Sequence, residues 1–128
     1  MNTLVIKDEA VSGKVLNEIS LKFENEYITV KELIAKRIEN EVERYQHDLS
    51  NYRIKGLVLP TDLETRLNRK DSIKIDVEKQ VYIALDAFKN NGFFILIDDE
   101  QVEHLEEKFL VDETTNVSFV KLTPLIGG

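Results

Sequence analysis

The sequence contains no cysteine and no tryptophan, and it has only two prolines. Without cysteine the chain has no disulfide, no thiolate metal site and no cysteine nucleophile, so any thiol chemistry must come from a partner. Basic residues are also scarce, because 17 Lys and Arg stand against 24 Asp and Glu, giving a formal net charge of −7. Phosphate affinity depends largely on clustered Lys and Arg, so this balance argues against nucleic acid as a partner.

Long apolar runs are missing as well. No stretch is long enough to span a bilayer and no signal peptide is recognisable, so we expect a cytoplasmic protein without a membrane partner. The content of 42% apolar and 32% charged residues is typical of a globular protein. A chain of 128 residues suits one hydrophobic core, so we expect a single domain over residues 1–128.

The first part of the chain predicts a hairpin followed by a helix. Residues 3–11 and 15–23 are strand-like and flank a Ser-Gly-Lys turn, which favours antiparallel pairing. Thr29 and Glu32 then form a capping box, a pattern that starts helices. The apolar stripe that follows predicts a helix over residues 30–47. Its members are Val30, Leu33, Ile34, Ile38, Val42 and Tyr45.

A second helix is predicted after Asp76. Its apolar stripe consists of Val77, Val81, Ala84, Leu85 and Phe88. The sequence Asn90-Asn91-Gly92 closes it as a left-handed cap. We interpret residues 48–92, which contain this helix, as an ordered helical insertion, because its apolar stripe needs a surface to bury against.

The last third predicts strands. Residues 93–97 are a continuous β-rich apolar run and the best candidate for a central strand. Residues 101–102 suit a very short strand, and residues 116–122 suit the last one. We expect the core to include residues of the hairpin, the first helix and these later strands. They are Leu4, Ile6, Ile19, Leu21, Leu33, Ile34, Ile38, Ile95, Ile97, Val117 and Phe119.

The sequence closes on a proline and two glycines. Pro124 lacks the amide donor that a sheet would use, so residues 123–128 should leave the sheet as an extended tail. Gly127 and Gly128 have no Cβ, so a narrow active site of another protein could approach their backbone from any side. We expect an unhindered carboxylate at Gly128.

This order of elements, with its Gly-Gly end, resembles the β-grasp fold of ubiquitin and of the sulfur-carrier proteins. Residues 94–104, F-I-L-I-D-D-E-Q-V-E-H, are similar to ubiquitin's third strand, turn and short fourth strand. Residues 117–128 are similar to its last strand and diglycine tail. The resemblance implies an α+β, ubiquitin-like β-grasp fold with residues 48–92 inserted between the main helix and the third strand. About 85 of the 128 residues are covered.

The departures point to a bacterial relative. The inserted segment is longer than ubiquitin's connection between these elements. The tail has Pro124, Leu125 and Ile126 where ubiquitin has basic residues. With these departures the chain is more similar to the ubiquitin-like proteins that are encoded beside activating-enzyme and protease genes in bacteria than to ubiquitin itself.

The resemblance implies a protein modifier rather than an enzyme. In this family an activating enzyme adenylates the terminal glycine with ATP, and the acyl group passes through a partner's thioester to a target amine. Carried over to this sequence, the resemblance implies that Gly128 supplies the reacting carbon and that Gly127 leaves room for the active site of the activating enzyme. The segment recognised by the activating enzyme is then Thr123, Pro124, Leu125 and Ile126. The implied partners are this enzyme, a conjugating enzyme and a deconjugating protease; no residue of the chain is catalytic, and no cofactor is required.

Two other functions share parts of this pattern. A sulfur carrier has the same fold and tail but ends in a thiocarboxylate. A β-grasp interaction module that is not conjugated would bind partners through its insertion, and deleting its tail would change nothing. By analogy with ubiquitin's exposed apolar patch, Leu96 and Val120 are a candidate docking patch, although both suit the core equally well if the inserted helix covers that face.

Acidic residues cluster in the last third without predicting a metal site. Asp98, Asp99 and Glu100 follow a strand and are typical of a solvated turn. His104 lies among glutamates, but a zinc site would need at least three oriented ligands. We interpret both groups as surface.

Overall fold

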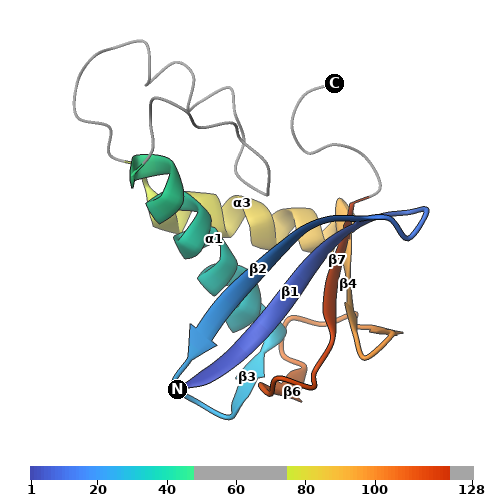
Figure 1. The fold of residues 1–128 in the computed structure, drawn as a ribbon. Coiled ribbons are helices and arrows are strands. Elements are labelled where there is room, and N and C mark those ends of the chain that lie inside the picture. Colours follow the sequence, from blue (N-terminus) through green and yellow to red (C-terminus); the bar gives the residue numbers. More distant parts are fainter. Residues whose placement is uncertain (48–74, 122–128) are drawn as a thin grey trace.

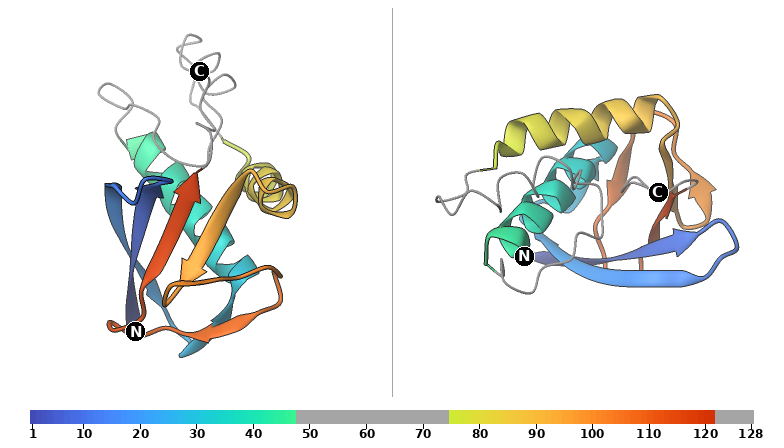
Figure 2. Two further views of the ribbon diagram at one scale, coloured as in Figure 1. Left: turned by 90° about the vertical axis from the view of Figure 1, so that its right-hand side faces the viewer. Right: turned by 90° about the horizontal axis from the view of Figure 1, so that it is seen from above.

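The computed structural model describes residues 1–47 and 75–121 of the 128-residue chain. The fold is α+β, with a mixed five-stranded sheet and two helices in the described part (Figure 1). Seen along the sheet, the helices form a layer on one of its faces (Figure 2). The fold class expected from the sequence is therefore correct at this level.

The predicted hairpin is confirmed. β1 (Asn2–Ala10) and β2 (Val15–Phe23) pair in antiparallel fashion along nearly their whole length. Gly13, in the connecting turn, has φ of +92°, a conformation that side chains disfavour, and its amide donates to the Ala10 carbonyl at 2.8 Å. Alternate residues in most of each strand are buried, as the period-two pattern predicts.

The main helix, α1 (Val30–His47), has the predicted bounds. Its first turn is capped by Thr29, whose Oγ1 accepts a hydrogen bond from the Glu32 amide at 3.1 Å. Before it, β3 (Tyr27–Thr29) pairs with β6 (Lys108–Leu110) as a separate two-stranded sheet. This small sheet was not predicted, because strands of three residues carry no readable periodicity.

The second helix, α3 (Val77–Lys89), is also confirmed. The Asp76 side chain accepts a hydrogen bond from the Lys79 amide at 3.1 Å, and Asn91 ends the helix with a left-handed φ of 60°. α3 packs against α1, and its buried Ala84 and Phe88 belong to the same core. The rest of the predicted insertion, residues 48–74, lies outside the described residues.

The sheet is completed by β4 (Phe93–Ile97), β5 (Glu100–Gln101) and β7 (Val117–Lys121), in the order β2-β1-β7-β4-β5. β7 runs parallel to β1 and antiparallel to β4. Residues 93–97 form an interior strand, paired with β7 on one side and with the two-residue edge strand β5 on the other, but the middle strand of the five is β7. The parallel pairing of β1 with β7 joins segments that are far apart in the sequence, and the hydrophobic periodicity within each segment does not predict it.

The core lies between the sheet and the helices. Every predicted core residue is buried except Ile97, which is partly buried. Three phenylalanines extend this core under α3: the Phe93 ring lies 5.8 Å, centroid to centroid, from both Phe88 and Phe119. The second helix therefore shares one continuous core with the first.

Candidate functional site

β7 is the strand from which the predicted tail departs. Lys121, its last residue, is opposite Ala10 on β1 and Phe93 on β4, so β7 is paired on both sides up to its final residue. A strand held between two neighbours is restricted in position along its whole length. Lys121, the last described residue of β7, is therefore held at a fixed central point of the sheet.

The predicted conjugation site and recognition segment lie outside the residues that the structure describes. They are Gly127, Gly128, Thr123, Pro124, Leu125 and Ile126. Their roles stay predictions. The strand β7, by contrast, is described up to Lys121, and a group of charged residues lies beside it.

Arg37, on α1, is the centre of this group and has no exposed surface. Its two terminal nitrogens donate to the two carboxylate oxygens of Asp8 on β1, with Nη2 and Oδ2 2.6 Å apart. Its Nε donates to Oε1 of Glu41, one helical turn further on, at 3.1 Å. Such a bidentate, fully hydrogen-bonded geometry is the one in which a buried ion pair recovers its desolvation penalty.

The guanidinium of Arg37 also stacks on the last strand. Its central carbon lies 4.6 Å from the centroid of the Phe119 ring, within the range of a cation–π contact. Burial alone would lower the pKa of Arg37, but its hydrogen bond to Asp8 and the negative charges of Glu41 and Asp8 outweigh burial and raise this pKa. Arg37 therefore stays a cation and connects β1, α1 and β7.

Lys121 adds a second cation at the end of β7. Burial lowers the pKa of its ammonium; the charge of Asp8 acts against this effect, while Arg37 reinforces it. We call Asp8, Arg37, Glu41 and Lys121 the Arg37 cluster. Its charges balance, and the Asp8 and Glu41 carboxylates are bound by the guanidinium, so its chemistry is that of a structural clamp at the end of β7.

Sequence reasoning missed the Arg37 cluster, although a signal was present. Leu4, Ile6 and Asp8 follow one another at every second position of β1, so the period-two pattern places Asp8 on the buried face. On α1, Arg37 and Glu41 fall at the three- and four-residue spacing of the apolar stripe. Charged residues at core positions of both patterns predict a buried ion pair between them.

The candidate docking patch is on the opposite face of the sheet. Leu96 and Val120 are partly buried and do not belong to the core cluster. Val120 is opposite Phe94 on β4 and Glu9 on β1, and Leu96 is opposite Ser118. The inserted helix α3 packs against α1 and the inward Phe93 and not over Leu96 and Val120, and their role as a docking patch stays a prediction.

Two acidic residues of the last third, Asp98 and Glu107, have backbone partners. Asp98 and Asn116 join the β4–β5 turn to the start of β7 through two hydrogen bonds, of 2.8 and 2.9 Å. The Glu107 carboxylate accepts the amides of His104 and Glu103, and these bonds lower its pKa. Within residues 1–47 and 75–121, no three His, Cys, Asp or Glu side chains are grouped so that they could hold a metal ion.

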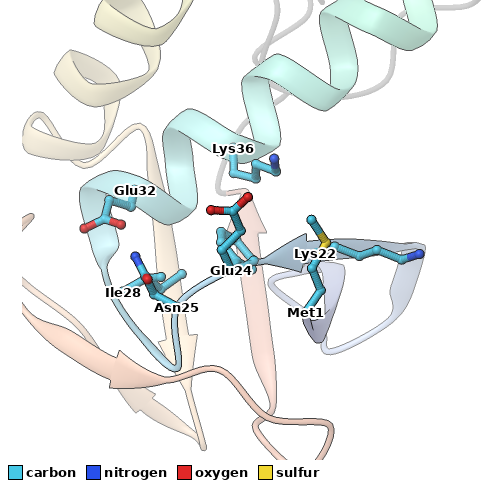
Figure 3. Close-up of a pocket in the computed structure, with 8 residues that line it drawn as sticks. Met1, Lys22, Glu24, Asn25, Ile28, Glu32 and Lys36 are labelled. Carbon is cyan, nitrogen blue, oxygen red and sulfur yellow. The ribbon is translucent and has the colours of Figure 1, made fainter.

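A hollow of about 260 Å³ lies at the other end of the sheet, between the end of β2 and the first half of α1 (Figure 3). Its charged lining residues carry both signs, and Glu24 points toward Lys36. They are Lys22, Glu24, Glu32 and Lys36, around Met1, Phe23, Asn25 and Ile28. None of the predicted site residues is among them.

The chain matches no family model, no curated protein and no solved structure. Of the helices in the described ranges, neither has the length and apolar character needed to cross a membrane. The proposal that follows therefore depends on the sequence resemblance and on the geometry around β7.

Proposed function

We propose that the protein is a ubiquitin-like modifier of the β-grasp class, in which the body of the fold presents the carboxylate of Gly128 to an activating enzyme. The carboxylate attacks the α-phosphorus of ATP and releases pyrophosphate. A partner's thiolate then attacks the carbonyl carbon and releases AMP. Finally a target amine displaces the thiol, loses a proton and forms an isopeptide bond.

The observation that carries the proposal is the position of β7. A β1–β2 hairpin followed by a helix, with the last strand inserted beside β1 and parallel to it, is the arrangement expected of a β-grasp. In this arrangement the final strand is central, and it ends next to the β1–β2 turn. Ala10, the last residue of β1, lies directly opposite Lys121.

The Arg37 cluster supports the proposal by fixing the base of the tail. Arg37 contacts Asp8 on β1 and Phe119 on β7, so the hairpin, the helix and the last strand are joined at one point. A segment threaded into another protein's active site needs a rigid base, because each additional mobile residue adds an ordering cost to binding. A base at Lys121 confines the threaded segment to residues 122–128.

The outer face of the sheet supplies a docking surface for the same partner. Leu96 and Val120 lie there with Phe94, partly exposed and on the strands beside the end of β7. Apolar side chains on a face that the described helices leave open are typical of an interaction site. Contacts here would add affinity while the tail reaches the catalytic centre.

The test uses the adenylating enzymes of the same genome. The protein is incubated with each enzyme and ATP, and intact mass spectrometry records adenylate, thioester, thiocarboxylate or protein adduct. Gly128→Trp should fold normally but form no product, because the bulky side chain obstructs the activating site. Glu106→Trp, an equally bulky change at an exposed site in the loop before β6, is the matched control and should react like the wild type.

The outcomes separate the three functions. An adduct with a partner protein supports the modifier, and a thiocarboxylate, in which sulfur has replaced oxygen, assigns the chain to the sulfur carriers. If no enzyme gives an ATP-dependent product, or if Gly128→Trp reacts like the wild type, the interaction module replaces both. The proposal also requires a free carboxylate on Gly128, which the mass of the protein isolated from its own cells establishes.

A further inference from the structure

The two edges of the five-stranded sheet are different. One edge is β5, which has two residues and offers little backbone for pairing. The other is β2, which has nine residues and contains neither proline nor glycine. Within the described residues no strand pairs with β2 on the side away from β1. An unpaired edge of this length presents a row of free amides and carbonyls to another strand.

The exposed side chains of β2 carry a self-complementary charge pattern. Glu18, Ser20 and Lys22 all point away from the core and are exposed, so the outer face of the edge reads negative, neutral, positive. If two copies of β2 pair in antiparallel fashion about Ser20, Glu18 of each copy lies directly opposite Lys22 of the other. Opposite charges at directly opposed positions stabilise a strand pair.

Neighbouring registers fit less well. Pairing about Glu18 or about Lys22 sets like charges against each other across the symmetry axis. Pairing about Leu21 would bring Glu18 of one copy opposite Glu24 of the other. Pairing about Ile19 is free of like-charge pairs, but it places Glu18 opposite Ser20 and Lys22 opposite Leu16, so neither charge meets an opposite charge. The Ser20 register alone matches both charges, and it also places Ile19 opposite Leu21 on the inner face.

We propose that β2 is a homodimer interface, in which two copies of the protein pair edge to edge about Ser20 and form one continuous ten-stranded sheet. Charges on an edge strand usually prevent association, but they do so by meeting like charges or by being buried. In the proposed dimer, Glu18 of each copy lies opposite Lys22 of the other copy. The two-fold symmetry makes the same short segment complementary to itself, as isologous interfaces require.

The dimer does not depend on the proposed function and is compatible with it. β1 separates β2 from β7, so pairing at β2 leaves the end of β7 and the outer patch around Leu96 uncovered. A contact through one strand is smaller than a standard interface, so the dissociation constant should be near 100 µM, an order-of-magnitude estimate. Sedimentation of the full chain over a concentration series measures it.

Charge reversal tests the register. Lys22→Glu sets a second carboxylate against that of Glu18 at both ends of the pairing, and dimerisation should weaken at least about tenfold. Glu18→Lys should do the same, and the double swap Glu18→Lys with Lys22→Glu should return to within about threefold of the wild type. Because Lys7 on β1 is opposite Glu18, the stability of each variant is measured by urea denaturation alongside. Lys79→Glu, at an exposed site on α3, is the matched charge control and should leave dimerisation unchanged.

Crosslinking gives a second readout, since the chain has no cysteine of its own. Ser20→Cys should form a disulfide dimer on mild oxidation, because directly opposed Cα atoms of an antiparallel pair lie about 4.5–5.5 Å apart, within the range of about 4.4–6.8 Å that a disulfide bridges. Glu18→Cys and Lys22→Cys should each crosslink poorly alone and well when mixed. A wild type that stays monomeric at about 2 mM overturns the proposal, because even a weak interface would be populated there. The proposal is also overturned if the charge reversals leave dimerisation unchanged, or if the double swap does not restore dimerisation.

Discussion

Two groups of mixed charges occupy opposite ends of the sheet, and their surroundings are different. At the end where β7 stops, Arg37 is fully buried between Asp8, Glu41 and the Phe119 ring. At the other end, the lysines and glutamates of the hollow in Figure 3 border open space, and Glu32 is exposed. Similar residue types therefore have different consequences, since an ion pair in water contributes little and an unpaired charge in the core is strongly destabilising.

The largest effect is expected from removing the buried cation. Arg37→Ala leaves Asp8 and Glu41 buried without the guanidinium and also removes the contact of the guanidinium with the Phe119 ring. The free energy of unfolding should fall by about 3–5 kcal/mol. Urea denaturation measures it, and a loss smaller than about 1 kcal/mol would show that water reaches the cluster.

Replacing the whole buried group should be much milder. In the triple variant Asp8→Leu, Arg37→Met, Glu41→Leu the guanidinium and both of its carboxylates are gone, and apolar side chains of similar volume fill the site. We expect it to recover most of the stability lost in Arg37→Ala, within about 2 kcal/mol of the wild type. If the triple variant is as unstable as the single one, packing rather than charge pairing accounts for the loss.

Lys121, in the Arg37 cluster, should make the stability of the protein depend on pH. Its pKa is lower in the folded protein than in the unfolded chain, chiefly through burial. Between these two pKa values the unfolded chain binds more protons, so this residue makes stability rise as pH increases toward 10.5. Lys121→Met, which leaves Asp8, Arg37 and Glu41 unchanged, should flatten this rise in stability. Urea denaturation midpoints from pH 7 upward measure the effect. If the urea midpoint rises with pH equally in the wild type and in Lys121→Met, the lowered pKa of Lys121 is contradicted.

The smallest effect is expected at the hollow. Lys36 is the sequence neighbour of Arg37 on the same helix, but it points to the hollow rather than into the core (Figure 3). Lys36→Ala should change the free energy of unfolding by less than about 0.5 kcal/mol, the usual range for surface sites. It is therefore the matched control for Arg37→Ala in the same denaturation series, and a loss above that range would remove the contrast between the two ends.

The sequence predicted elements whose signal is local. The bounds of α1 were readable because its stripe starts at a capping residue, Thr29, and α3 is framed by Asp76 and Asn91 in the same way. Pairings between distant segments were not readable, and this is why the sequence did not predict that β7 is the middle strand, between β1 and β4. The three-residue strands β3 and β6 exist only because they pair with each other, and neither has a pattern of its own.

Prediction of the candidate site from the sequence had the same limit, because a local pattern does not show which elements pack together. The resemblance offered Leu96 and Val120 as an outer patch but did not say which face the second helix covers, and its packing against α1 decides this. Asp8 and Arg37 were each visible as charges at core positions, but no single element shows that they meet. The tail residues 123–128 lie outside the described part, so their roles depend on the resemblance alone.

The parallel pairing of β1 with β7 has a consequence for synthesis of the protein. The two strands are far apart in the chain, so the ribosome releases the partner of β1 long after β1 itself. Until then β1 and β4 have no neighbour between them, and exposed edges of this kind promote aggregation. Pairing across such a separation is also slow. A nascent chain that stalls before Val117 therefore stays an incomplete sheet, and the sheet can close only after translation has passed β7.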